Sequence, residues 1–359
     1  MSTPRADVVG SLLRPAYLRE ARQAAREGRG TPEVLRAAED RAVREAIALQ
    51  EAAGLDVVTD GELRRSSWVI TIPLREEATA RAPLAGFQFL PADPGWWSLW
   101  KEPDGRRAQV WTHPTRPFIT QPVRVVRDVV SDEYAFLKAH ARARTKFTIP
   151  APSWHRIFWH RDYSRAAYPT PEDFLRAIAG YLREHVVPAI RALGGDYIQM
   201  DAPNYAQWHV DRDNRAAFEA WGHDMAAELA ADAEIDDSVF EGVSGVTRAI
   251  HICRGNAPGG RWLADGGYEA IAAQVFPRLP GTTGCCWNTT RPGPATSGRC
   301  ATSDQTRWRC WACSPPSGAI WRTRPRSRLG SGRRQVSSRS SSLRSARSAA
   351  SHPARPATR

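Results

Sequence analysis

The sequence lacks long apolar segments and an N-terminal leader. No apolar run approaches the roughly 20 residues that a membrane-spanning helix requires. The first ten residues, MSTPRADVVG, contain no cationic and hydrophobic signal segment. At 359 residues with 42% hydrophobic side chains, the chain can bury a sizeable core and is too long for a small disulfide-stapled domain. We therefore expect a cytoplasmic protein with no membrane partner.

The segment 282–359 has almost no acidic side chains. It contains 15 arginines, no lysine and a single acidic residue, Asp304, which give it a net charge of +14. The remaining 35 basic and 37 acidic side chains lie in residues 1–281, which are therefore close to neutral. Five of the six cysteines also lie in 282–359, where neither helical nor strand periodicity is present. We predict a catalytic domain over 1–281 and a basic, low-complexity, disordered tail over 282–359.

Residues 1–281 alternate between strand-like and helix-like patterns. The strand-like segments lie at 8–11, 55–59, 146–150, 197–200 and 249–253. This alternation indicates an α/β fold with parallel strands. Polar residues follow several strands, as they do at the catalytic face of an eight-stranded TIM-type barrel. No G-x-G-x-x-G motif supports the alternative, a Rossmann sheet. We predict a (β/α)8 barrel that is incomplete, with about five β/α units and an irregular C-terminal tail.

Helix signals lie between the predicted strands. A threonine followed by a proline, at 31–32 and again at 170–171, is typical of a helix start. The first helix should end at Gly54, and the second should run to Leu193 with a kink at Pro188. Two further helices are expected at about 214–232 and 267–278.

His251 and Cys253 form the sharpest local motif. Two residues apart on a strand, their side chains point to the same face, and imidazole with thiolate is a ligand pair that zinc favours. The alternative is a packed histidine beside a buried thiol. Because Arg254, Gly255 and Asn256 follow at the expected strand end, the position strengthens the metal-site interpretation, and the two interpretations stay open.

Three polar residues follow other predicted strands. Glu62 and Asp201 could hold the ammonium group of an amino-acid substrate or transfer protons. Alternatively, Glu62 pairs with Arg64 or Arg65, and Asp201 caps the next turn. Ser11 could offer its hydroxyl and backbone N–H to a substrate carboxylate, or it could simply belong to a Gly-Ser turn.

The basic tail suggests two weaker alternatives. Cys310 and Cys313, with Cys285 and Cys286, superficially resemble a zinc ribbon, but the spacing after the first pair does not match one. The arginines could bind nucleic acid electrostatically, as any such polycation does at low salt. The corresponding hypothesis is a nucleic-acid-binding module that acts through 282–359.

Five motifs together resemble the cobalamin-independent methionine synthase family. They are VVGSLLRP at 8–15, GLDVVTDGELRRSSW at 54–68, IPAPS at 149–153, YIQMDAPNYA at 197–206 and HICRGN at 251–256. Their order and spacing are similar to those of the single-barrel members, which correspond to the C-terminal catalytic domain of the two-barrel enzymes. The resemblance covers residues 8–281.

The resemblance implies an enzyme that transfers a methyl group to the thiol of homocysteine and so makes methionine. In the family, a zinc ion in a β/α barrel binds the thiol and keeps its sulfur ionised. The resemblance implies His251 and Cys253 as zinc ligands, and Ser11, Glu62 and Asp201 as contacts to homocysteine. A methyl donor is the second small-molecule partner. The alternative within the same chemistry is an epoxyalkane–coenzyme M transferase.

Two metal-ligand motifs of the family are absent from the sequence as read: a Leu-Leu-Glu-Tyr-Asp-type strand and a late Cys-Gly-Phe. A shifted reading frame restores both. The last base of the Trp287 codon and the first two of the Asn288 codon form GAA, a glutamate codon, within codons that permit Leu-Leu-Leu-Glu-Tyr-Asp. In the same frame, 307–317 permit a leucine-rich strand and 346–352 permit Pro-Gln-Cys-Gly-Phe-Ala. We hypothesise a one- or two-base insertion or deletion near codons 279–283.

The frameshift hypothesis predicts that the coding DNA, when resequenced, restores both motifs in one frame. A single uninterrupted frame, together with mass-spectrometric detection of peptides from 282–359 as read, would contradict a sequencing error and leave only a natural frameshift. The chain as read should express poorly or aggregate, because the loss of about three β/α units exposes sheet edges. A monodisperse product that melts cooperatively would contradict that expectation.

Overall fold

The computed structural model describes residues 8–91, 99–102, 104–107, 115–255, 261–288 and 309–313. All of them lie in one compact unit, 1–318; a second unit, 319–359, contains no described residue. No helix in these ranges is long and apolar enough to cross a membrane.

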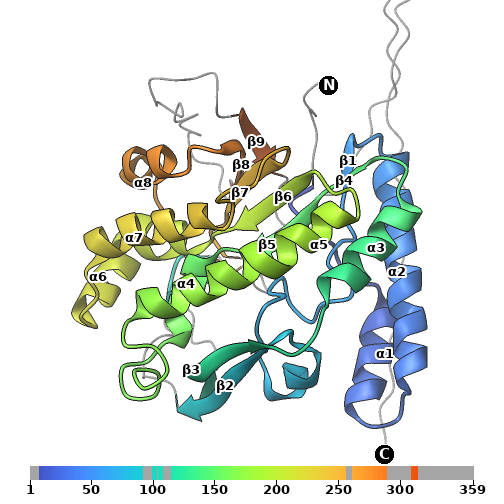
Figure 1. Ribbon diagram of the computed structural model, residues 1–359, viewed down its shortest axis with the longest axis horizontal. Helices are drawn as coiled ribbons and strands as arrows, with labels where there is room; N and C mark the ends of the chain where they lie inside the picture. Colours follow the sequence, from blue (N-terminus) through green and yellow to red (C-terminus); the bar gives the residue numbers. More distant parts are fainter. Residues whose placement is uncertain are drawn as a thin grey trace, which may run out of the picture. The chain divides into compact units, whose positions relative to one another are not determined.

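A parallel β-sheet forms the centre of the compact unit (Figure 1). Its strands, in spatial order, are β5 (Phe147–Pro150), β6 (Tyr197–Asp201), β7 (Thr247–Ile252), β8 (Thr282–Asn288) and β9 (Arg309–Cys313). A short parallel pair, β1 (Val57–Val58) with β4 (Arg144–Thr145), continues the series, because β4 precedes β5 by one residue. That residue, Lys146, donates its backbone N–H to the Val58 carbonyl at 3.0 Å. All the strands of this series run in the same direction, as the alternating pattern predicted.

Helices accompany the parallel strands: the first two precede β1, and the others lie between later strands. The helices are α1 (Ala16–Arg26), α2 (Pro32–Ala52), α3 (Val130–His140), α4 (Pro171–Tyr181), α5 (Val187–Ala192), α6 (Arg212–Ala220), α7 (Met225–Ser238) and α8 (Glu269–Val275). Figure 1 shows α1, α2 and α3 side by side, and α4 and α5 running across β5 and β6. An antiparallel hairpin of β2 (Leu84–Pro91) and β3 (Thr115–Val125) lies outside this pattern.

Short 3-10 and π-helical turns complete the described segments. The 3-10 turns are Glu76–Arg81, Pro152–Phe158 and Phe276–Arg278, and the π-helical turns are Leu182–Val186 and Tyr205–Val210. Two of them, Pro152–Phe158 and Tyr205–Val210, follow β5 and β6 and contribute to the cavity described below.

The predicted helix-start signals are confirmed. The Thr31 side chain accepts a hydrogen bond from the Val34 backbone N–H, and Gly54, with φ of 75°, follows the end of α2. At the start of α4, Thr170 and Asp173 form a reciprocal capping box. The kink expected at Pro188 takes the form of the π-helical turn before α5, since proline cannot donate the backbone hydrogen bond of a regular helix.

Two expected elements differ from the structure. Residues 8–11 are not a strand, because the carbonyl oxygens of Val8 and Val9 accept hydrogen bonds from the side chains of Lys146 and Gln199 instead of a neighbouring strand. The single helix expected at 214–232 is two helices, α6 and α7. The chain turns between them at Gly222, whose φ of 90° is incompatible with a continuous helix.

The sheet extends past the predicted domain boundary at residue 281. β8 and β9 lie in 282–359, the segment expected to be a tail without strands. Parallel pairing uses backbone N–H and C=O groups, which any sequence supplies, and β7 offers them along its free edge. Within the described ranges the strands form an open series, so the α/β class is confirmed, whereas a closed barrel is not formed.

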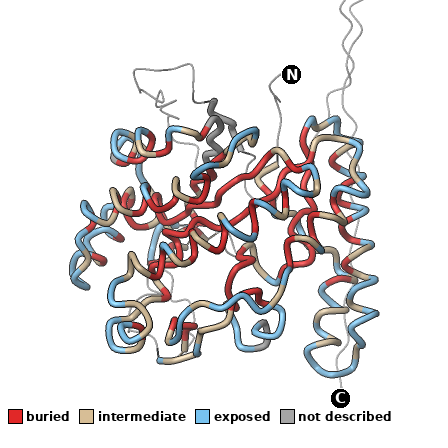
Figure 2. Tube along the Cα trace, viewed as in Figure 1, coloured by how far each residue is buried: buried red, intermediate tan, exposed pale blue. Residues whose placement is uncertain are grey.

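The core lies between the helices and the sheet. All four residues of β5 and all five of β6 are buried, and the inward faces of the helices are buried against them (Figure 2). Phe174, Leu175 and Ile178 of α4 are each 0% exposed. The alternation of buried and exposed positions in α4 follows the 3.6-residue period of an amphipathic helix.

We expect Leu175→Ala to lower the free energy of unfolding by about 2–5 kcal/mol, because the substitution removes buried methyl groups and leaves a cavity in the core beside α4. The matched control is Leu49→Ala on α2, where the leucine is 66% exposed; its effect should stay within about 0.5 kcal/mol. Urea unfolding of both variants measures the difference. Equal losses of stability would contradict this account of the core.

Candidate active site

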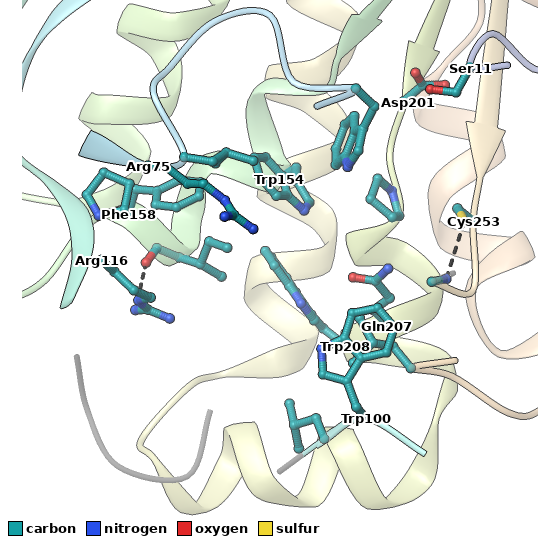
Figure 3. Close-up of a pocket in the computed structure, with 18 of the residues that line it drawn as sticks. Ser11, Arg75, Trp100, Arg116, Trp154, Phe158, Asp201, Gln207, Trp208 and Cys253 are labelled. Carbon is teal, nitrogen blue, oxygen red and sulfur yellow. Dashed lines mark hydrogen bonds between the residues drawn. The ribbon is translucent and has the colours of Figure 1, made fainter. Parts of the chain in front are cut away.

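A cavity of about 810 Å³ opens at the carboxyl ends of the parallel strands. Ser11, Glu62, Asp201, His251 and Cys253 all line it, so the structure brings together every residue that the sequence singled out. They come from four separate parts of the chain. In Figure 3, Ser11, Asp201 and Cys253 lie on one side of the cavity. Their proposed roles remain predictions.

Glu62 is held in a strained conformation at the polar end of this cavity. Its φ of 55° is in the left-handed region, which a non-glycine residue rarely adopts. The carboxylate accepts hydrogen bonds from the Ser11 hydroxyl and, at 2.7 Å, from Thr148 Oγ1. Gly10 leaves room for it, since a Cβ there would lie 2.6 Å from Glu62 Oε1. The local fold therefore fixes the position of this carboxylate.

The alternative interpretation of Glu62 is also partly present. Arg65 Nη1 lies 4.0 Å from Glu62 Oε1, and Arg65 makes a closer ion pair with Glu133, at 2.8 Å. Glu62 is therefore near a buried cation while its carboxylate still lines the cavity.

Asp201 is the second buried carboxylate of the cavity. It accepts a hydrogen bond of 2.7 Å from Gln199 Nε2, and Gln199 Oε1 accepts one of 2.7 Å from Lys146 Nζ. Burial, followed by the negative charge of Glu62, raises the pKa of Asp201 well above its usual range. A cationic group between the two carboxylates would relieve this repulsion, as the ammonium of an amino acid would.

His251 and Cys253 meet the cavity where β7 ends. His251 is 6% exposed, and Cys253 is half-buried, with its Sγ 3.3 Å from the Gly255 backbone N–H that donates to it (Figure 3). Among the residues that the structure describes, no group of three or more His, Cys, Asp or Glu side chains could hold a metal ion. The described residues therefore do not complete a zinc site, which needs about four ligands.

Aromatic side chains line the rest of the cavity. Trp68 and Trp154 pack edge to face with ring centroids 4.7 Å apart, and Phe158 and Trp208 also line the cavity. In Figure 3, Arg75 and Arg116 lie on the side opposite Asp201 and Cys253. The cavity thus has a polar end, an aromatic wall and a cationic side.

Sequence reasoning missed several of these residues. Gln199 and Asp201 alternate on β6, so the two-residue period of a strand could have placed Gln199 beside Asp201. Thr148 on β5 and Lys146, the residue directly before β5, show the same period. The sequence also gives no signal for Trp100, which lines the cavity. The neighbouring Trp96, Trp97 and Trp111 lie outside the described residues.

Known proteins with similar sequences cover most of this chain. Protein YxjH of Bacillus subtilis, named as uncharacterized, is 30% identical over 278 residues, which are 77% of this chain and 68% of YxjH. A methionine synthase of Sulfurisphaera tokodaii is 27% identical over 218 residues, or 58% of this chain and 56% of that protein. The chain belongs to the cobalamin-independent methionine synthase family. No protein-family model matches the sequence.

Solved structures show that the fold is shared with other proteins of the cobalamin-independent methionine synthase family. A putative vitamin-B12-independent methionine synthase from Listeria monocytogenes superposes with a TM-score of 0.58 at 20% identity, over 85% of this chain and 78% of that one. A B12-independent methionine synthase from Shewanella, solved with selenomethionine, has a TM-score of 0.51 at 20% identity, over 80% and 74%. The α/β architecture is therefore that of the family.

We expect Asp201→Asn to stabilise the fold at pH 8 and to have no stabilising effect near pH 3. The raised pKa means that the folded protein keeps a proton which the unfolded chain releases above about pH 3.9. Folding therefore carries a cost that is absent below that pH and grows as the pH rises toward the raised pKa. Asparagine removes the charge and keeps an oxygen that accepts from Gln199.

Urea unfolding at several pH values measures this effect. The matched control is Asp162→Asn, in which the replaced side chain is 71% exposed. A stability difference between parent and Asp201→Asn that does not change with pH would contradict the electrostatic origin.

Proposed function

We propose that the cavity binds homocysteine and that the protein transfers a methyl group to its sulfur, forming methionine. The observation that carries the proposal is the pair of buried carboxylates, Glu62 and Asp201, beside His251 and Cys253 in one cavity. The carboxylates suit the substrate ammonium, and the Ser11 hydroxyl, which donates to Glu62 in this structure, would exchange that bond for one to the substrate carboxylate. These contacts would direct the thiol toward His251 and Cys253. The names of the relatives support the same reaction.

The reaction requires one bond to form and one to break. The ionised sulfur attacks the methyl carbon, an S–CH3 bond forms, and the bond between methyl and donor breaks with its electron pair leaving on the donor. Fixed contacts to the amino-acid end orient the sulfur for in-line attack. The thiol proton must leave before or during binding, because the thiolate is the nucleophile.

We infer that the methyl donor has a flat aromatic body and anionic groups. The tryptophan-lined wall offers faces for stacking, and Arg75 and Arg116 lie on the far side from the carboxylates. A relative that is 46% identical over 61 residues is named 5-methyltetrahydropteroyltriglutamate–homocysteine methyltransferase, and its pteridine-containing donor has this chemistry.

A complete zinc site would need ligands that the described residues of the chain as read do not supply. His251 and Cys253 would supply two ligands, and zinc would keep a bound thiol ionised. The shifted reading frame would supply a glutamate at the Trp287–Asn288 junction and a later cysteine. In support, that glutamate codon falls at the end of β8, whose Trp287 pairs with Ile252 between His251 and Cys253.

The coenzyme M alternative fits the cavity less well. Coenzyme M carries a sulfonate and no ammonium. Its negative charge would therefore face the buried carboxyl groups of Glu62 and Asp201 without a cation between them. A nucleic-acid-binding role would depend on 282–359, most of which lies outside the described residues.

We expect the frame-corrected protein to alkylate homocysteine and to reject coenzyme M. Glu62→Gln should raise the KM for homocysteine at least tenfold, because an amide cannot neutralise the ammonium, while Glu45→Gln on the exposed face of α2 should leave it unchanged. The rate at which free thiol disappears in the presence of a methylated pteridine donor measures the choice of thiol and the KM of each variant. Equal rates with the two thiols would contradict the proposed substrate.

Metal content provides the control for this assay. The frame-corrected protein should retain about one zinc per chain, and the chain as read should retain far less, because its described residues supply two ligands. Undiminished activity after chelation, or after His251 and Cys253 both become alanine, would contradict the role given to zinc.

A further inference from the structure

In a second cavity, of about 610 Å³, arginine is the most frequent lining residue. Residues of α1, of α2, of the segment after β1 and of the start of α3 form its wall, where Figure 1 shows α1, α2 and α3 together. Eight of its lining residues are arginines and three are acidic. Like charges repel when they converge on one cavity, so this excess is unfavourable unless an anion compensates it.

Internal ion pairs account for part of this charge. Glu39 accepts hydrogen bonds from Arg81 at 3.0 and 3.1 Å, and Glu133 accepts one from Arg65 at 2.8 Å. Arg22 also pairs with Glu39 and Arg36 with Asp132, each at 3.5 Å, and Arg64 pairs with Asp40 outside the lining. The arginines of the wall that have no ion pair with a described residue are therefore Arg26, Arg75 and Arg127.

Several arginine groups remain without such a partner. Arg75 and Arg127 make no ion pair with any described residue, and Arg26 is exposed and bonds the neutral side chain of Gln23. Arg65 is only 5% exposed, yet its Nη2 has no hydrogen-bond partner in the structure. A buried guanidinium nitrogen without a partner is costly, and an anion or its hydration shell is the partner that such a group favours.

We propose that this arginine-lined cavity is a binding site for a small polyanion, a molecule with several closely spaced phosphate or carboxylate groups. Arginine binds both groups in bidentate geometry, and the cavity is large enough for several of them. The proposal does not rest on the methyl-transfer function.

The polyanion site is physically connected to the candidate active site. Arg75 lines both cavities. Arg65 Nη1 donates to Thr148 Oγ1 at 3.2 Å, and that hydroxyl donates to Glu62 Oε1 at 2.7 Å. An anion near Arg65 would therefore act on a side chain that holds the Glu62 carboxylate in place.

Calorimetric titration of the full chain with inorganic tripolyphosphate and, separately, with citrate tests the proposal. We expect one saturable site per chain. The double variant Arg26→Gln, Arg127→Gln should weaken binding at least tenfold. The matched control removes the same charge from exposed positions on α4 and α6, Arg176→Gln with Arg215→Gln, and should stay within twofold of the parent.

Binding of tripolyphosphate alone would identify a phosphate site, and binding of both anions a general polyanion site; each supports the proposal. Equal weakening in the two double variants would assign the binding to overall charge, including that of 282–359, and would overturn it. Absence of saturable binding by both anions would overturn it as well. The circular dichroism of all variants must match the parent.

Discussion

The close approach of two buried carboxylates is the constraint on which the candidate active site depends. Glu62 and Asp201 come from different strand ends, and burial followed by the negative charge of Glu62 raises the pKa of Asp201, so an ionised Asp201 needs compensation. The surroundings provide part of it: Lys146 reaches Asp201 through Gln199, and Arg65 lies beside Glu62. The remaining compensation would come from a cationic substrate group, which makes the repulsion a source of selectivity.

Arg65 links the candidate active site to the arginine-rich cavity. Arg65 contacts Thr148 on the side of Glu62 and lines the arginine-rich cavity on the other. The residues between the cavities are buried and hydrogen-bonded, so a change of charge on one side acts on the other through fixed contacts and not through flexible loops.

Several features followed from local patterns and are confirmed in the structure. The threonine–proline helix starts depend on a side-chain oxygen and a fixed φ, and both act within one turn. The parallel order of the strands followed from their alternation with helices. By contrast, β8 and β9 were not predicted. β8 pairs along the free edge of β7 and β9 along the free edge of β8, and neither pairing depends on the apolar pattern of TTGCCWN or RCWAC.

The sequence by itself determined that Glu62, Asp201, His251 and Cys253 follow or end strands, and that Ser11 follows Gly10 in a turn. It did so because side-chain period and turn chemistry are local properties. Only the tertiary structure decided that these five line one cavity, that a tryptophan wall faces them, and that eight arginines converge on a second cavity. Such arrangements join residues far apart in the chain, and their charges interact only after the sheet has brought them within a few ångströms.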